Sequence, residues 1–484
     1  MKTKFDRILK RAVFGLLLAA IFLTVYLLYC TKGTSFKWEI IGIAGVAGFV
    51  FGVLLPAAHS TIARFIFHVK GIMYFSRAET SSGEKADKLF AKCYENYEKV
   101  IKIKPDYISI LNWWGHALRK HALKKKGDEG LKLLQRACNK FEEALKIKPD
   151  NYYALKQSAL LLVKQARKQR NEESDELFKG AYKKCERLIK IKPNDIEPLD
   201  ILGTSLLLQA NTKTGEEARK LFSEANKKFS EAVKVEPNNH ELLYYCGYSL
   251  LAQIQDQKGE GKQELLLKAC EYYERAIKIK SDDFVTLYDY GCAIGMLGEI
   301  KTGEESEKLF SQSCEKLKQA LKLKPDGYDV LKALGSNLCV ISNKTTGAKK
   351  CDFLEQACEY FQKALEINSN PEDSEILMNW GLALVNLADN KDDNQRQDFL
   401  EKAKDKFLKA EDIEPGIGAY DLACVCALQK NEDECERWLK KGEELGTLPS
   451  QDYALKDDDL KSVRPKEWFQ KIQWDKSHSS TEPI

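Results

Sequence analysis

The chain lacks the sequence motifs of the common enzyme classes. Its 484 residues contain no G-x-x-x-x-G-K-[ST] phosphate loop, no G-x-G-x-x-G dinucleotide loop, no G-x-S-x-G nucleophile elbow and no H-E-x-x-H zinc motif. Histidine is scarce, with six scattered residues, and the carboxylates fall mostly in polar turns. We therefore expect no catalytic residue, no cofactor and no bound metal. An enzyme whose active site these motifs miss is the alternative.

The chain also lacks an excess of charge after residue 59. The first 59 residues hold seven of the 76 Lys and Arg and two of the 72 Asp and Glu, which leaves 69 basic and 70 acidic residues. Proteins that bind nucleic acid usually concentrate positive charge on one surface. The balanced region therefore predicts no nucleic-acid partner, and the positive excess belongs to the N-terminus.

Metal-binding cysteine motifs are missing, although the chain has 14 cysteines. Cys424, Cys426 and Cys435 come closest together, but no second close pair or nearby histidine completes a set of four ligands. Other cysteines recur at one position of a repeat, where free cysteine packs as a small hydrophobic residue: Cys138, Cys270, Cys314 and Cys358. Reduced structural thiols in a cytosol-like compartment are expected.

Proline is rare, with 12 residues, and it marks a repeat of 44 residues. Steps of 44 give the column Pro105, Pro149, Pro193, Pro237, Ser281, Pro325 and Ser369, and a last step of 46 reaches Pro415. Before Pro149, the spacing of Ala137, Phe141 and Ala144 is that of one helical face, which proline then ends. Ten residues after each proline stands a small residue: Gly115, Ala159, Gly203, Gly247, Gly291 and Gly335. The regular period favours one elongated array.

These columns resemble the tetratricopeptide repeat (TPR) family, in which helix A carries Leu111, Trp114, Gly115 and Leu118 and helix B carries alanines, an aromatic residue and proline. The resemblance covers about residues 60–447. The usual period is about 34. Here charged, glycine-bearing segments such as 213–222 and 301–310 are added between the helices, which predicts a turn and a longer helix B. The resemblance implies an all-α, right-handed superhelical solenoid, with eight helix pairs over residues 60–415.

The segment after Pro415 departs from the repeat. Residues 416–474 predict an atypical last helix pair and a C-terminal cap. The cap resembles the closing segment of some bacterial TPR proteins through Asp457, Asp459, Leu460, Arg464 and Trp468. Residues 475–484 are short and polar, so we expect a disordered tail.

The N-terminus predicts a membrane anchor. Residues 1–11 are basic, and two uncharged runs, 12–30 and 40–58, are each long enough to cross a bilayer. Together they predict a transmembrane hairpin, residues 12–58, with the lipid bilayer as a partner. The greater positive charge outside the short connecting turn places both termini in the cytoplasm. A cleaved signal peptide is the weaker alternative, because the first run is long and no cleavage site follows it.

The second run contains a stripe of small residues, Ala44, Gly48 and Gly52. Such a stripe lets two membrane helices approach closely. Packing within the hairpin explains it most simply, and a homo-oligomer is the alternative. The apolar helix expected over 60–78 follows at once and caps the solenoid. A bacterial inner membrane is favoured by the resemblance of the closing segment, and an organelle membrane is the alternative.

In the TPR family, helix A lines a concave groove, mainly at its second, fifth, ninth and twelfth positions when Gly115 is counted as the eighth. The resemblance therefore implies these partner-binding residues: Asn112, His116, Arg119, Tyr153, Lys156, Asp200, Thr204, Tyr244, Tyr248, Tyr288, Lys332 and Ser336. Tyrosine among polar residues suits a protein or peptide partner. Packing of these tyrosines against the next repeat is the alternative.

One specific ligand is disfavoured. TPR proteins that hold the C-terminal carboxylate of chaperones need a lysine at the fifth and an asparagine at the ninth position, but Lys156 is followed by Leu160 and Lys332 by Ser336. We therefore expect a membrane-anchored scaffold that recruits or assembles other protein partners at the cytoplasmic membrane face. An assembly or quality-control factor for one membrane protein complex is the narrower alternative.

Overall fold

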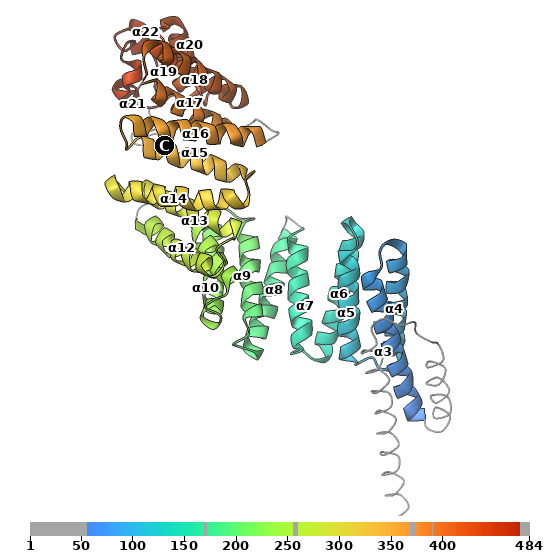
Figure 1. Ribbon diagram of the computed structural model, residues 1–484. Helices are drawn as coiled ribbons and strands as arrows, with labels where there is room; N and C mark the ends of the chain where they lie inside the picture. Colours follow the sequence, from blue (N-terminus) through green and yellow to red (C-terminus); the bar gives the residue numbers. More distant parts are fainter. Residues whose placement is uncertain (1–55, 169–171, 255–259, 368–372, 390, 475–484) are drawn as a thin grey trace, which may run out of the picture. The chain divides into compact units, whose positions relative to one another are not determined.

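The computed structural model describes residues 56–168, 172–254, 260–367, 373–389 and 391–474, and these residues are predominantly helical (Figure 1). Within these ranges no β-strand occurs. The chain divides into two compact units, Met1–Ala154 (unit 1) and Leu155–Ile484 (unit 2), each described by itself. The all-α class expected from the sequence is confirmed.

Two kinds of helix alternate along the chain. The A helices are α3 Pro56–Thr80, α5 Ile108–Leu123, α7 Tyr152–Ala166, α9 Ile196–Ala210, α11 His240–Leu251, α13 Phe284–Ile300, α15 Tyr328–Ser342 and α17 Ser374–Ala388. The B helices are α4 Gly83–Ile103, α6 Gly127–Ile147, α8 Glu172–Ile191, α10 Gly215–Val235, α12 Glu260–Ile279, α14 Gly303–Leu323, α16 Ala348–Ile367 and α18 Asp393–Ile413. Within unit 2, each pair from α9 to α18 packs A helix against B helix, and each B helix also contacts the next A helix (Figure 1).

The added residues of each repeat lengthen helix B, as predicted. Every B helix is 20 or 21 residues long. Gly83, Gly127, Gly215 and Gly303 each begin one of them, with φ between 57° and 63°. A Cβ atom at these glycines would meet no atom within 4 Å, so the backbone conformation rather than the available space calls for glycine there.

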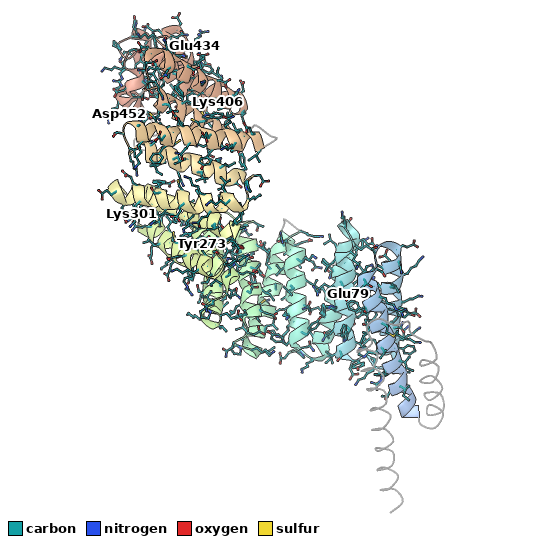
Figure 2. The ribbon with its side chains drawn as sticks, viewed as in Figure 1. Glu79, Tyr273, Lys301, Lys406, Glu434 and Asp452 are labelled. Carbon is teal, nitrogen blue, oxygen red and sulfur yellow. The ribbon has the colours of Figure 1, made fainter. Side chains whose placement is uncertain are left out.

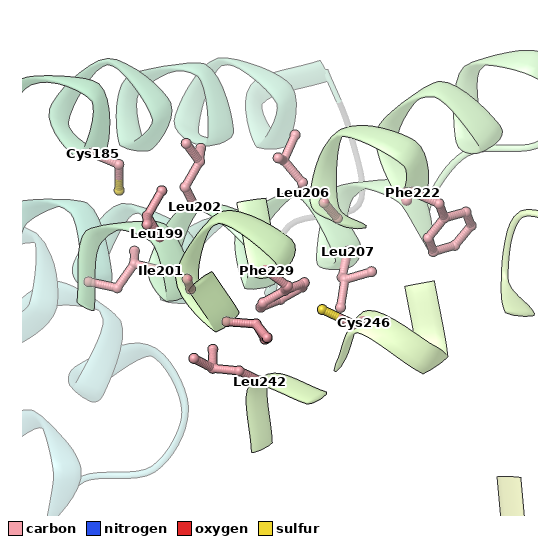
Figure 3. Close-up of a cluster of buried hydrophobic side chains, with 14 of the residues drawn as sticks. Cys185, Leu199, Ile201, Leu202, Leu206, Leu207, Phe222, Phe229, Leu242 and Cys246 are labelled. Atoms are coloured by element: carbon pink, nitrogen blue, oxygen red, sulfur yellow. The ribbon is translucent and has the colours of Figure 1, made fainter. Parts of the chain in front are cut away.

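A second column of glycines brings helix A close to helix B. A Cβ atom at Gly247 would lie 2.7 Å from Tyr273 Cε1, and one at Gly203 would lie 2.7 Å from Phe229 Cζ. Tyr273, labelled in Figure 2, and Phe229 are fully buried. Phe229 belongs to the core cluster in Figure 3, which joins residues of α7, α8, α9, α10, α11 and α12. The small residue ten positions after each proline is therefore a packing requirement.

The N-terminal predictions lie mostly outside the described residues. Residues 1–11 and the hairpin as far as residue 55 are not described, nor is the predicted tail 475–484. Helix α3 is described from Pro56 to Thr80, so it extends beyond both ends of the predicted 60–78. In the part of the chain that is described, no helix combines the length and the apolar character needed to cross a membrane.

The C-terminal segment closes unit 2. Helices α19 Ala419–Leu428 and α20 Glu432–Leu445 are only 10 and 14 residues long, and α21 Gln451–Lys456, the 3-10 turn η1 Asp458–Leu460 and α22 Glu467–Gln470 follow. Leu460, Phe469 and Ile472 are buried in one cluster with Leu439 of α20, and Trp468 packs beside it. The closing segment thus covers the last helix pair with apolar side chains.

Candidate partner-binding face

All twelve residues that the sequence selects lie on A helices. Asn112, His116 and Arg119 are on α5, Tyr153 and Lys156 on α7, Asp200 and Thr204 on α9, Tyr244 and Tyr248 on α11, Tyr288 on α13, and Lys332 and Ser336 on α15. None of them is buried in the core, and nearly all are half-buried. The neighbouring positions of each helix, such as Leu243 and Cys246, are fully buried. The helical period therefore separates a core side from a partly exposed side, which we call the A-helix face.

Side chains of the A-helix face connect consecutive A helices in unit 2. Lys156 Nζ of α7 lies 2.5 Å from Glu197 Oε2 of α9. Lys332 Nζ of α15 lies 3.1 Å from Asp373 Oδ2 and 2.7 Å from Glu375 Oε2 of α17. The selected residues of neighbouring repeats therefore face a common surface. Lys156 and Lys332 therefore also join consecutive repeats.

In unit 1 the selected residues of the A-helix face form hydrogen bonds between uncharged side chains instead of ion pairs. His116 Nδ1 and the Tyr153 hydroxyl are 2.9 Å apart, and the Asn112 amide donates to Asn151 at 3.3 Å. Burial lowers the pKa of His116, and the nearby Arg119 lowers it further. His116 is therefore largely neutral at neutral pH. This part of the face offers amide, imidazole and guanidinium groups.

The A-helix face of unit 2 carries a tyrosine cluster. The rings of Tyr244 and Tyr248 stack with centroids 6.1 Å apart, and Tyr245 meets Tyr244 edge-on at 5.3 Å. The Tyr244 hydroxyl of α11 donates to Asp289 Oδ2 of α13 at 3.0 Å. Burial raises the pKa of Asp289 to about 6, although the hydrogen bond from Tyr244 opposes this effect.

A second carboxylate lies in the same cluster, on the other side of α11. Burial raises the pKa of Asp200, and the charge of Glu241 raises it further, while the Thr204 hydroxyl hydrogen-bonds to the carboxylate. Asp200 also raises the pKa of Tyr245 after the larger effect of burial. The tyrosines of α11 thus lie between two half-buried carboxylates, one from α9 and one from α13.

Sequence reasoning missed Asp289 and Tyr245. Both stand at the sixth position of helix A, one residue after Tyr288 and Tyr244 and 44 residues apart. The groove rule selected the second, fifth, ninth and twelfth positions only. The sequence shows that Tyr245 and Asp289 occupy the same position of consecutive repeats. It does not show that a side chain of one A helix contacts the sixth residue of the next A helix, as Tyr244 does with Asp289.

The cysteines of the described residues are free thiols. Cys424, Asp457 and Asp459 bring possible ligand atoms within 4.8 Å of one another. The two Asp457 oxygens accept hydrogen bonds from the Tyr420 hydroxyl at 2.7 Å and from the Asp459 backbone N–H at 3.0 Å. The Tyr420 bond fastens the closing segment to α19, and the Asp459 bond holds the turn of the closing segment, so Asp457 has a structural role.

Comparison with known proteins gives one family model that matches part of the chain and several similar solved structures. Residues 172–288 match the model of the family described as plant specific mitochondrial import receptor subunit TOM20. No curated protein matches the chain.

Three similar solved structures differ in how much of this chain they cover. YrrB, described as a TPR protein with an unusual peptide-binding site, has 16% identity and a TM-score of 0.34, covering 48% of this chain and 93% of its own. The C-terminal part of a TPR repeat-containing protein from Cytophaga hutchinsonii has 14% identity and a TM-score of 0.42, covering 63% and 95%. TTC0263, a thermophilic TPR protein of Thermus thermophilus, has 20% identity and a TM-score of 0.30, covering 47% and 98%.

Proposed function

This chain is a TPR repeat protein, and from that premise we propose that it is a membrane-anchored scaffold. It recruits or assembles protein partners at the cytoplasmic face of a membrane. The partner segment lies in the groove of a right-handed superhelix, against the A-helix face. No catalytic step, cofactor or metal is needed for this role.

The observation that carries the proposal is the composition of the A-helix face. Half-exposed tyrosine, amide and charged side chains recur on α5, α7, α9, α11, α13 and α15, whereas the opposite sides of these helices are buried. Tyrosine provides a large contact area with few rotatable bonds and keeps a hydroxyl for hydrogen bonding. A repeated surface of this kind suits an extended peptide or a helix of a partner protein.

The anchor rests on the sequence. Residues 12–30 and 40–58 are the proposed spans, with both termini in the cytoplasm. Helix α3 follows them, has Arg64, Lys70 and Arg77 but no acidic residue before Glu79, and exposes 41% of Phe65. This composition is compatible with a position next to anionic lipid headgroups. A bacterial inner membrane is favoured, and an organelle membrane is the alternative.

The partner-binding role can be tested by affinity purification of the full-length protein from detergent. The Tyr244→Ala/Tyr248→Ala variant should lose its partners, which mass spectrometry would identify. Tyr272→Ala/Tyr360→Ala is the matched control, because it removes two half-buried tyrosines from the B helices α12 and α16. Identical partners in all three samples would refute binding through the A-helix face. Recovery of one integral-membrane complex would favour the assembly-factor alternative.

The anchor can be tested by alkaline carbonate extraction of cell membranes. We expect the wild-type protein to stay in the membrane pellet and Leu17→Arg/Ile21→Arg/Val46→Arg/Val50→Arg, with two arginines in each proposed span, to be released. Leu123→Arg/Leu267→Arg is the control, since both leucines are more than half exposed, at 57% and 51%. Release of the wild-type protein by carbonate would contradict an integral anchor.

A further inference from the structure

Three consecutive A helices of unit 2 contain no lysine or arginine. Helices α9, α11 and α13 carry only acidic charges, at Glu197, Asp200, Glu241, Asp289 and Glu299. The B helices that separate them, α10 and α12, contain several lysines and arginines. These three helices therefore contribute only negative charge to the A-helix face, of which the Glu197 charge is paired with Lys156 of α7, in a chain whose repeat region has balanced charge.

In the described part of the chain, no basic side chain pairs with the two most enclosed carboxylates of this face. Asp289 receives its hydrogen bond from the Tyr244 hydroxyl, and Asp200 from Thr204. Two half-buried aspartates elsewhere in the described part of the chain are each paired with a lysine, whereas Asp421 and Asp459 near the C-terminus are not. Lys125 Nζ is 2.8 Å from Asp87, and Lys213 Nζ is 2.7 Å from Asp175. An ionised carboxylate that is half-buried without a nearby cation lowers the free energy of unfolding. A role in binding a partner would explain why Asp200 and Asp289 lie on this face.

Aromatic rings lie beside these carboxylates. Tyr244 and Tyr248 stack on one another, and the ring of Tyr288 stacks on Phe284 with an interplanar angle of 6°. Elsewhere the chain covers such rings with its own cations, since Lys140 Nζ lies 4.3 Å from the centroid of Trp114 and Lys406 Nζ 4.3 Å from that of Trp380. In the described part of the chain no lysine or arginine lies over Tyr244 or Tyr248 in this way.

We propose that the face formed by Asp200, Tyr244, Tyr248 and Asp289 binds an arginine-bearing segment of the partner protein. The arginine guanidinium is planar, so it stacks on a tyrosine ring and forms paired hydrogen bonds with a carboxylate. The negative charge of α9, α11 and α13 attracts a basic segment and repels an acidic one. This inference rests on the proposed function, because it names the partner chemistry of the same face.

The test uses the full-length protein in detergent and fluorescence anisotropy. The probe is a fluorescein-labelled peptide of alternating arginine and alanine. Its control has citrulline at each arginine, which keeps the shape of the side chain but removes the charge. We expect the arginine peptide to bind at least about tenfold more tightly than the citrulline peptide. This comparison needs no variant, so a folding defect cannot affect it.

Variants then locate the binding. Asp200→Asn/Asp289→Asn should lower the affinity for the arginine peptide by about tenfold or more. The matched control, Glu271→Gln/Glu304→Gln, removes the same charge from exposed positions of the B helices α12 and α14 and should leave the affinity within about twofold. Circular dichroism checks that each variant is folded.

Two results would overturn the inference. One is equal affinity for the arginine and citrulline peptides, and the other is equal loss of binding in the two pairs of charge variants. Either result leaves the proposed function intact if Tyr244→Ala/Tyr248→Ala still loses its partners from detergent extracts. Unchanged partners in that tyrosine variant would instead refute the A-helix face as the binding surface.

Discussion

Helix α5 of unit 1 and the helices α9, α11 and α13 of unit 2 share a repeat but differ in charge. In unit 1, α5 carries Arg119 and Lys120 and no acidic residue. In unit 2, α9, α11 and α13 carry acidic residues and neither lysine nor arginine. The same glycine and aromatic columns pack both regions, since Gly115 meets Phe141 as Gly247 meets Tyr273. Packing therefore restricts one side of each A helix and leaves the chemistry of the other side free to differ.

Each A helix therefore has two sides with separate roles, one in packing and one on the exposed A-helix face. The core side decides whether the helices pair, and under the proposed function the A-helix face selects the partner. Four substitutions test that separation, beginning with the one that should have the largest effect.

The largest effect is expected for Gly247→Arg. A Cβ atom at this position would lie 2.7 Å from Tyr273, and the rest of the side chain would place a charge between α11 and α12. We expect a loss of at least about 3 kcal/mol in the free energy of unfolding. Gly215→Ala is the control, because it has φ +62° and open space, and it should cost only about 1–2 kcal/mol. Thermal melting followed by circular dichroism measures both, and equal melting temperatures would contradict this packing role.

Thr204→Arg places on α9 of unit 2 a guanidinium like that of Arg119 on α5 of unit 1. The new guanidinium would lie beside Asp200, whose carboxylate hydrogen-bonds to Thr204. It should compete with the arginine peptide and weaken its binding by about tenfold, or about 1.4 kcal/mol. Ser336→Arg changes the same position of α15 and should have a smaller effect, because α15 already contains Lys332. If Thr204→Arg binds the peptide like wild type, charge does not distinguish the two regions.

Asp289→Asn should stabilise the protein at neutral pH. Burial raises the pKa of Asp289 to about 6, so the folded state holds the proton more tightly than the unfolded chain. The resulting stability is present below the unfolded pKa and is lost as the pH rises through about 6. At neutral pH the ionised carboxylate therefore costs stability, and asparagine should recover about 1 kcal/mol after allowance for partial exposure.

The measurement is urea unfolding of the wild type and Asp289→Asn at about pH 7.5 and about pH 4.5, where the difference should shrink. The titratable groups whose pKa the Asp289 charge affects are Tyr244, Tyr273, Tyr288 and Cys292, from α11, α12 and α13, and of these Tyr244 also donates its hydrogen bond to Asp289. Burial raises the pKa of each of them, that of Cys292 to about 12, so none titrates in this range. A difference that grows on acidification would contradict the assignment. A stabilised variant with weaker peptide binding would show that Asp289 is kept for recognition.

The smallest effect is expected for Lys156→Met. The ion pair with Glu197 joins α7 to α9, but 56% of the Glu197 side chain is exposed to solvent. Exposed pairs of this kind contribute little, so the free energy of unfolding should fall by about 0.5 kcal/mol or less. Urea unfolding at low and high salt measures the loss. A change larger than that of Gly215→Ala would show that the A-helix face also holds the array together.

Much of the architecture could be predicted from the sequence because the residues that pack helix A against helix B recur at the same positions of successive repeats. The step of 44 residues located Gly115, Gly203 and Gly247, and each contacts the aromatic residue of the following B helix. Charged residues around Gly215 and Gly303 predicted the extension of helix B, which begins at these glycines. The groove rule placed all twelve selected residues on A helices, but it did not select Tyr245 or Asp289.

The sequence by itself determined the helix pairs, because each depends on contacts within one repeat, where residue spacing translates directly into a helical face. Only the tertiary structure decided the chemistry of the A-helix face. The Tyr244 hydroxyl reaches Asp289, 45 residues away, and burial between α11, α12 and α13 sets the pKa of that carboxylate. The order of residues along one chain does not specify which charges meet across neighbouring helices or how far water is excluded from them, and these two factors set the charge that the face presents.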